Sequence, residues 1–277
     1  MHRKVADTME AVQERVRSAA DSILSRIGTL PEIGLILGSG LGEFAERLQQ
    51  RLILPTSSIP HYPIGTVAGH KGRLVFARTE TGRPVIAFQG RIHFYECNDL
   101  SAVLFPIFIA HELGVKTLVI TNAAGGVNRH FRPGDLMVIR DQINLTSESG
   151  LTPATRWGNV RRSLYDPDLV SLTLQTAQRL GMPVQCGVYA GVKGPSYETA
   201  AEVEMVHRAG GDAVGMSTVL EVRQAAALGI RILGVSCITN KATGIGTQPL
   251  DHSEVTDVAE QVKERFALLL SNVLLSL

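Results

Sequence analysis

The chain has 277 residues, 44% of them hydrophobic and 19% charged, and its 27 basic and 26 acidic side chains give a net charge of +1. A chain of this size can bury a large core, and its balanced charge provides no field that would gather nucleic acid or anionic lipid. No apolar run approaches the roughly 18 residues of a membrane span. Three scattered cysteines (Cys97, Cys186 and Cys237) are too few for a disulfide framework or a CxxC zinc site, so we expect a cytoplasmic protein without a structural metal.

The first predicted elements are a helix and a strand that enters a glycine-rich turn. Apolar residues recur every three or four positions from Val5 to Ile27, which predicts an amphipathic packing helix that ends near Gly28. The apolar run Ile33–Leu37 then predicts a strand leading into GSGLG at 38–42. Helical spacing resumes after this turn, so the unit is predicted to be strand, glycine turn and helix.

The rest of the chain alternates short apolar runs with helical stretches. Continuous apolar strands indicate a sheet covered on both faces, because a sheet covered on one face alternates apolar with polar residues. With no linker or repeat visible, we expect a single α/β domain over 1–277, a three-layer α/β/α arrangement around a mixed, twisted sheet, with 1–28 as its N-terminal packing helix. Further strands are predicted at 74–77, 85–89, 117–121, 136–140, 186–190, 213–216 and 232–238, and helices near 99–113, 168–181, 198–209, 218–229 and 254–275.

The glycine turn at 38–42 is a candidate anion site. A tight turn between a strand and a helix gathers backbone N–H groups, and Ser39 adds a hydroxyl. It is not a dinucleotide fingerprint, because Glu43 occupies the position of the third glycine. An ordinary strand-to-helix turn would explain the same residues.

A second candidate oxyanion site follows the strand at 85–89. In the segment GRIHFYE, an extended backbone would point Arg91, His93 and Tyr95 to the same side, since side chains alternate faces along a strand. A guanidinium can grip phosphate through two parallel hydrogen bonds, and an imidazole N–H adds another donor. The alternative is an arginine that pairs with a surface carboxylate.

Two more strand ends and one loop carry weaker signals. TNAAGG at 121–126 combines an amide with small residues, as if the backbone approaches a ligand closely, although a tight turn would also explain it. Ser217 follows a short strand and could cap the next helix, bind an anion, or do both. His70 lies in a loop between two glycines, where a histidine is often simply solvated.

Complementary polar groups stand at Glu198 and Asn240. A carboxylate only accepts hydrogen bonds, whereas an amide donates and accepts, so together they could bind a flat heterocycle with an N–H edge and a carbonyl, such as a 6-oxopurine. Separately, Glu198 could be a first-turn acid facing a helix dipole and Asn240 a turn residue. His252 precedes the last helix, either beside its cap or facing a ligand.

Taken in order, these segments resemble the trimeric purine nucleoside phosphorylase family, in the branch specific for 6-oxopurines. The likeness runs from about Ile33 to the last helix and is carried by ILGSGLG, GHKGRL, GRIHFYE, TNAAGG, GPSYETAAE, GMSTVLEV and ITNKATG. The resemblance implies an enzyme of purine salvage that splits inosine or guanosine with orthophosphate as co-substrate. It further implies the family's nucleoside phosphorylase fold, a homotrimer, and no metal or organic cofactor.

The resemblance also assigns residues to three subsites, and it implies that Asn240, His93 and Glu198 take part in catalysis. The implied phosphate residues are Ser39, His70, Arg91, His93, Ala123 through its backbone, and Ser217. The implied purine residues are Tyr197, where the family usually has Phe, Glu198 and Asn240. The implied ribose residues are Tyr95, Met216, His252 and, reaching in from a neighbouring subunit, Trp157 in Arg-Trp-Gly, which resembles the family's Arg-Phe-Gly.

Other activities are compatible with parts of this pattern. Methylthioadenosine phosphorylase shares the implied fold but typically has aspartate at the position of Asn240, which argues against it. Xanthosine phosphorylase stays an alternative, because its substrate differs from inosine by an additional 2-carbonyl group that the enzyme must bind. A non-catalytic nucleotide-binding module could reuse the glycine turn, but it gives no reason for Arg91, His93, Glu198 and Asn240 to occur together. A serine hydrolase is excluded by the lack of a GxSxG elbow.

Overall fold

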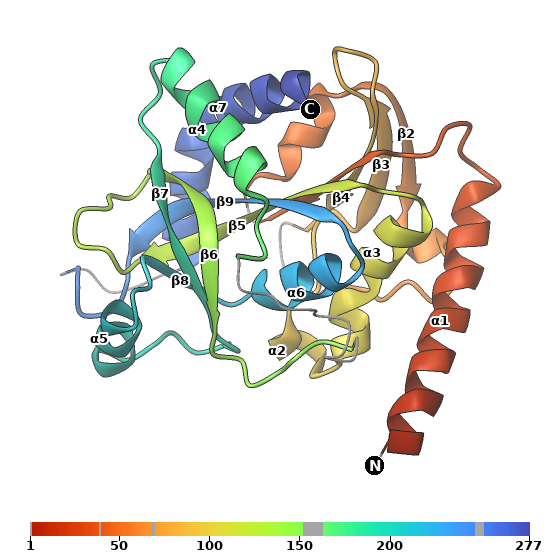
Figure 1. The fold of residues 1–277 in the computed structure, drawn as a ribbon, viewed down its shortest axis with the longest axis horizontal. Coiled ribbons are helices and arrows are strands. Elements are labelled where there is room, and N and C mark those ends of the chain that lie inside the picture. The colour runs from red at the N-terminus through yellow and green to blue at the C-terminus, as the bar shows by residue number, and fades with distance from the viewer. Residues whose placement is uncertain (1, 39, 68–69, 152–162, 247–251) are drawn as a thin grey trace.

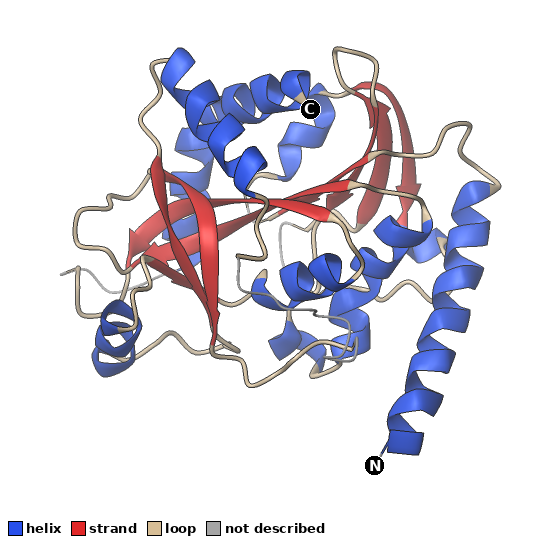
Figure 2. Ribbon diagram, in the orientation of Figure 1, coloured by secondary structure: helices blue, strands red, loops and turns tan. Residues whose placement is uncertain are grey.

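The computed structural model describes residues 2–38, 40–67, 70–151, 163–246 and 252–277, with the backbone alone described in 2–8 and 252–256. A mixed sheet crosses the molecule with helices on both faces, which confirms the predicted α/β class (Figure 1). Figure 2 shows the same layers by secondary structure. The strands are β1 (Ile33–Leu37), β2 (Gln49–Pro55), β3 (Arg73–Arg78), β4 (Pro84–Gln89), β5 (Thr117–Gly126), β6 (Leu136–Asn144), β7 (Gln185–Gly191), β8 (Ala213–Gly215) and β9 (Arg231–Lys241).

The helices divide between the two faces of the sheet. On one face α4 packs on α7, and on the other α3 contacts both α1 and α6 (Figure 1). The helical elements are α1 (His2–Leu24), two short 3-10 turns (Gly42–Arg47 and Thr56–Ser58), α2 (Phe94–Cys97), α3 (Leu100–Glu112), α4 (Pro167–Arg179), α5 (Ala200–Arg208), α6 (Val219–Ala227) and α7 (His252–Ser276).

The sheet has an open part and a closed part that share β5. The order β2-β3-β4-β1-β5 forms the open part, in which β1 runs parallel to both β4 and β5. Strand β5 also pairs in parallel with β9 and, at its far end, antiparallel with β8. Because β8, β7, β6 and β9 pair in turn, these strands close into a ring with β5. The carboxyl ends of β1, β5 and β9 therefore point to one edge, where α/β sheets commonly bind ligands.

Apolar residues on alternate positions of the central strands build a core on each face. In β1, Leu35 and Leu37 face the cluster that contains Phe266 of α7, whereas Ile36 faces the cluster that contains Phe105 of α3. Burying each of these side chains contributes about 1.5–3 kcal/mol. The continuous apolar runs of the sequence reflect this burial on both sides.

Several predicted elements differ from those observed. Strand β2 was not predicted, because its apolar run is short, Leu52 to Leu54, and follows the polar residues 49–51. The helical stretch after the glycine turn is a 3-10 helix at Gly42–Arg47. The backbone is not extended through 90–96, which was the condition for strand alternation to place Arg91, His93 and Tyr95 on one side, since α2 begins at Phe94 with His93 as its N-cap. A cap hydrogen-bond network outweighs the local strand pattern here.

Candidate functional site

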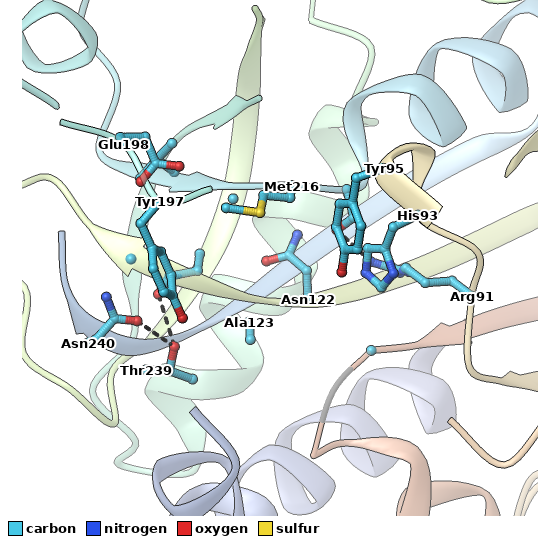
Figure 3. A pocket seen from close by; sticks show the side chains of 16 residues that line it. Arg91, His93, Tyr95, Asn122, Ala123, Tyr197, Glu198, Met216, Thr239 and Asn240 are labelled. Atoms are coloured by element: carbon cyan, nitrogen blue, oxygen red, sulfur yellow. Dashed lines mark hydrogen bonds between the residues drawn. The ribbon is translucent and has the colours of Figure 1, made fainter. Parts of the chain in front are cut away.

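An open pocket lies at the carboxyl edge of β1, β5 and β9 (Figure 3). It encloses about 720 Å3 of space, part of it open to solvent. Segments that follow β4, β7 and β8 complete its wall. The lining side chains predicted from the sequence are Arg91, His93, Tyr95, Ala123, Tyr197, Glu198, Met216, Ser217 and Asn240.

Four further predicted residues either do not line this pocket or lie outside the part of the chain that the structure describes. His70 lines a neighbouring cavity and reaches the pocket only through its contacts with Arg91 and His93. Ser39 and Trp157 lie outside the described residues. His252 is the first residue of α7, but its side chain is likewise outside the described part of the chain.

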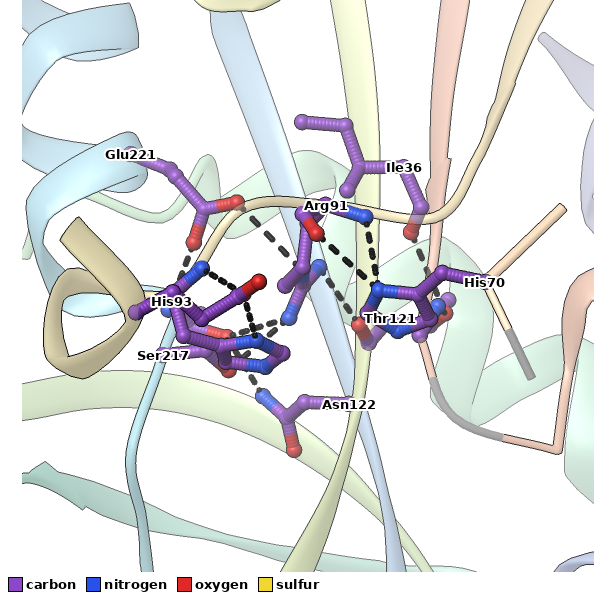
Figure 4. A network of polar contacts seen from close by, with 11 residues as sticks. Ile36, His70, Arg91, His93, Thr121, Asn122, Ser217 and Glu221 are labelled. Atoms are coloured by element: carbon purple, nitrogen blue, oxygen red, sulfur yellow. Dashed lines mark hydrogen bonds and ion pairs between the residues drawn. The ribbon is translucent and has the colours of Figure 1, made fainter. Parts of the chain in front are cut away.

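Arg91 is the cation at one end of the pocket, and it is 5% exposed (Figure 4). Its Nη1 donates to Ser217 Oγ at 2.8 Å, and its Nη2 donates to the carbonyl of Thr121 at 2.8 Å. Its Nε lies 3.4 Å from Oε1 of the buried Glu221. The guanidinium is thus fixed by α6, β5 and the turn before α6, and it is ready to donate to an anion.

His93 is held by the carboxylate of Glu96. Glu96 Oε1 accepts from the His93 backbone N–H at 2.6 Å and lies 2.9 Å from His93 Nδ1. Burial, followed by the charge of Arg91, lowers the pKa of His93 to about 4, so the ring is neutral near pH 7. A carboxylate only accepts, so Nδ1 carries the ring proton and Nε2 is the nitrogen with a lone pair. His93 must therefore gain a proton before Nε2 can donate to an anion.

Three rings stack beside this cation. The His70 and His93 centroids are 5.5 Å apart, and those of His93 and Tyr95 are 4.9 Å apart, with interplanar angles of 16° and 14°. Burial, followed by the charge of Arg91, also lowers the pKa of His70. Tyr95 lies in the first turn of α2 and lines the pocket there. Its ring is placed by stacking on His93 and not by the alternation of side chains along a strand.

The opposite end of the pocket carries an acceptor and an amide. Burial raises the pKa of Glu198, which lies just before α5. Asn240 Oδ1 accepts from Thr239 Oγ1 at 3.0 Å, and its Nδ2 donates to the Lys241 carbonyl at 3.0 Å. An amide nitrogen has two hydrogens, so one of them remains for a ligand. Tyr197, 43% exposed, provides an aromatic face beside them (Figure 3).

Sequence reasoning noted the amide in TNAAGG without giving Asn122 a role, and it missed Glu96 and Glu221. Asn122 is 1% exposed and donates from Nδ2 to Thr218 Oγ1 at 2.8 Å. Glu96 and Glu221 each stand three residues after an N-cap, His93 and Thr218, and accept from its backbone N–H. That spacing is the capping box, which was readable in GRIHFYE and GMSTVLEV.

Glu96 links two loops, and its removal should change the pH dependence of stability. Its Oε2 accepts from the N–H and the hydroxyl of Thr66 at 2.6 and 2.8 Å. Burial alone would raise the pKa of Glu96, but the hydrogen bonds from His93 and Thr66 outweigh it and lower the pKa from 4.5 to about 2. A depressed carboxyl pKa stabilises the fold above the unfolded value and loses this contribution as the pH falls through the folded value.

We therefore expect Glu96→Gln to be less stable than the parent protein above pH 4.5, with a difference that narrows as the pH falls towards 2. Urea unfolding of both proteins across this range measures the difference. Glu80→Gln, at an exposed position, is the control for replacing a glutamate by glutamine. A gap for Glu96→Gln that stays constant with pH would contradict the hydrogen-bonded carboxylate.

Neither a membrane-spanning helix nor a metal-binding cluster occurs among the described residues. No helix there is long and apolar enough to cross a membrane. No group of histidine, cysteine, aspartate or glutamate side chains among the described residues is arranged to hold a metal ion.

Comparison with known proteins gives consistent matches along the chain. Residues 32–275 match the family model of the phosphorylase superfamily. The chain is 47% identical over 267 residues to purine nucleoside phosphorylase 1 of Bacillus subtilis, covering 95% of this chain and 98% of that protein. A solved structure of Schistosoma mansoni purine nucleoside phosphorylase with inosine matches with a TM-score of 0.85 and 34% identity, over 95% of this chain and 96% of that one. Another, of the same organism's enzyme with adenosine, has a TM-score of 0.83 and 34% identity, over 94% and 96%.

Proposed function

The chain belongs to the purine nucleoside phosphorylase family, and from this premise we propose that it cleaves inosine and guanosine with orthophosphate. The products are the free purine and ribose 1-phosphate. The observation that carries the proposal is the polarity of one pocket, with Arg91, His93 and Ser217 at one end and Glu198 and Asn240 at the other. The reaction needs both ends, because positive charge builds on the ribose and negative charge on the departing base.

At the first end, orthophosphate is both anion and nucleophile. Arg91 and the Ser217 hydroxyl donate to it, and the backbone of Ala123 borders it. Because His93 is neutral near pH 7, we infer that Nε2 takes a proton from dihydrogen phosphate as this anion binds and then donates a hydrogen bond to it. A phosphate oxygen then attacks the anomeric carbon from the side opposite the base, the C–N bond breaks, and the configuration inverts. Ser39 and His70 complete this end in our proposal.

At the second end, the purine is held by its edge. The Glu198 carboxylate accepts from N1–H, the free hydrogen of Asn240 Nδ2 donates to N7 as negative charge develops there, and Tyr197 packs on the ring. Adenosine presents a lone pair at N1, which repels the carboxylate. The Schistosoma mansoni purine nucleoside phosphorylase has nevertheless been solved in complex with adenosine. We therefore expect adenosine to differ from inosine more in its turnover than in its binding.

The ribose lies between the two ends. We assign it to Tyr95 and Met216, which line the middle of the pocket, and to His252 near the 5′-hydroxyl. Trp157 of a neighbouring subunit closes the site in a homotrimer. Orthophosphate is the co-substrate, and the residues named supply the required charge stabilisation with neither metal nor organic cofactor.

Trp157 gives this arrangement an optical test, because it is the only tryptophan of the chain. Inosine should shift or quench its fluorescence, since binding changes the polarity around an indole at the pocket rim. Trp157→Phe keeps an aromatic ring and should remove the signal while retaining activity. A native protein whose fluorescence is unchanged by saturating inosine, or whose mass in solution is that of one chain, would contradict the shared site.

Hypoxanthine release from inosine, with and without orthophosphate, tests the function. The proposal predicts release only with phosphate, and equimolar ribose 1-phosphate. Release without phosphate would indicate a hydrolase that uses a similar pocket. No release with inosine, guanosine, xanthosine or adenosine would favour a binding module.

A further inference from the structure

Glu221 is a buried carboxylate next to the pocket without being part of its lining. It lies in the first turn of α6, is 3% exposed, and is absent from the side chains that surround the pocket. Its Oε1 lies 3.4 Å from Arg91 Nε, and its Oε2 accepts from the Thr218 backbone N–H at 2.6 Å. One carboxylate therefore contacts both the cation of the pocket and the turn that follows β8 (Figure 4).

That turn has a backbone conformation that its residue type disfavours. Thr218 has φ +74°, in the left-handed region that a β-branched residue rarely adopts, so neighbouring contacts must hold it. The conformation directs Ser217 Oγ to Arg91 Nη1 at 2.8 Å and Thr218 Oγ1 to Asn122 Nδ2 at 2.8 Å. Glu221 thus supports the turn through Thr218 N–H and the guanidinium through Nε.

Only a carboxylate satisfies both neighbours. A carboxylate accepts from the Thr218 backbone N–H and places a negative charge beside Arg91 Nε, whereas an amide is neutral and places a donor at one of the two positions. Among the described residues, Arg91 Nε has no hydrogen-bond partner, so the negative charge of Glu221 is its compensation. A neutral side chain here leaves that buried charge unpaired.

The negative charge of Glu221 and its orienting contacts predict opposite effects on phosphate binding. A negative carboxylate beside Arg91 weakens the field that attracts an anion, so its removal would tighten phosphate binding if charge were its only effect. If its effect is to orient Arg91 and Ser217, its removal weakens phosphate binding. Replacing Glu221 by a neutral residue therefore shows whether its charge or its orienting contacts dominate.

We propose that Glu221 is a positioning residue that holds Arg91 and the Ser217–Thr218 turn in the geometry that binds phosphate. The inference rests on the proposed function, because it requires phosphate at Arg91 and Ser217. It concerns the phosphate end alone, since Glu198 and Asn240 have no contact with Glu221 among the interactions described.

The test is Glu221→Gln, with KM for phosphate and KM for inosine measured separately. We expect the phosphate KM to rise by about 10- to 100-fold, the range found when side chains that orient metal ligands are changed, and the inosine KM to change by less than about threefold. A phosphate KM that is unchanged or lower would overturn the proposal. So would an equal rise in both KM values. If Glu221→Gln does not fold, Glu221→Asp keeps both acceptors on a shorter stem, and an unchanged phosphate KM in that variant also overturns it.

Two controls separate positioning from general loosening. Val222→Ala removes a fully buried side chain of the same helix and should lower thermal stability without a selective change in phosphate KM. In an Arg91→Met background, Glu221→Gln should add less than about a twofold effect, because the group that it orients is missing. A further selective rise of the phosphate KM in the Arg91→Met background would contradict a positioning effect that acts through Arg91. If the parent enzyme releases hypoxanthine without phosphate, the proposed function has failed rather than this inference.

Discussion

Arg91→Ala is expected to raise the phosphate KM by about 100-fold or more while the inosine KM changes little. Truncating one partner of a buried, hydrogen-bonded charge pair costs about 2–5 kcal/mol, and each 1.4 kcal/mol is about tenfold in affinity. Arg91 is buried and donates to Ser217 and to the Thr121 carbonyl, so its loss also removes one donor to the Ser217 hydroxyl. Initial rates at varied phosphate and saturating inosine measure the effect.

The same substitution should destabilise the protein, because it leaves Glu221 buried without its cation. The expected loss is about 3–5 kcal/mol, measured by urea unfolding. Arg83→Ala is the matched control, since Arg83 pairs with Glu32 at the surface and such pairs contribute at most about 1 kcal/mol. An Arg91→Ala enzyme with an unchanged phosphate KM and a raised inosine KM would remove Arg91 from the phosphate end.

Asn240→Asp is expected to lower inosine turnover by about 100-fold or more and to favour 6-aminopurine nucleosides. The carboxylate of the variant cannot donate to N7, and its charge opposes the negative charge that develops on a departing 6-oxopurine; loss of one such donor costs about 100- to 1,000-fold. A carboxylate would instead accept from the 6-amino group of adenosine. The ratio of kcat/KM for adenosine to that for inosine measures the shift.

Asn240→Asp also changes the hydrogen bonds of this side chain within the protein, so a matched control is needed. In the Asn240→Asp variant, the new carboxylate would still accept from Thr239 Oγ1, but it would face the Lys241 carbonyl without a hydrogen to donate. Asn98→Asp, at an exposed left-handed cap of α2, makes the same chemical change outside the pocket and should leave the ratio unchanged. An unaltered substrate preference in Asn240→Asp would exclude Asn240 from the base end.

The short-range parts of this structure follow from local chemistry. The strand Ile33–Leu37 has the predicted bounds because continuous apolar residues suit a strand buried on both faces. The helix at 100–112 begins after Asp99, whose carboxylate caps it, as expected for a short acidic side chain before an apolar run. Where such signals were short, as in the largely exposed strand Gln49–Pro55 with its apolar run of Leu52 to Leu54, the element was not predicted.

Within the pocket, the sequence determined which groups are available, and it did so through motifs whose order resembles one family. It did not determine how those groups are oriented. Arg91, His93 and Tyr95 converge although the backbone turns into α2 at Phe94, because Glu96 caps that helix and the His70, His93 and Tyr95 rings stack. The cap is local and was readable in GRIHFYE, but the stacking of His70 on His93 joins residues distant in the chain, and no local pattern encodes it.

The sequence by itself determined the α/β class, the family and the chemical groups of the candidate site, since these depend on residue type and order. Only the tertiary structure decided that Glu221 faces Arg91, which lies 130 positions earlier in the chain, and that Asn122 holds Thr218. The physical reason is burial: removed from water, each charge and each polar group must find a partner, and the fold alone determines which partner is within reach.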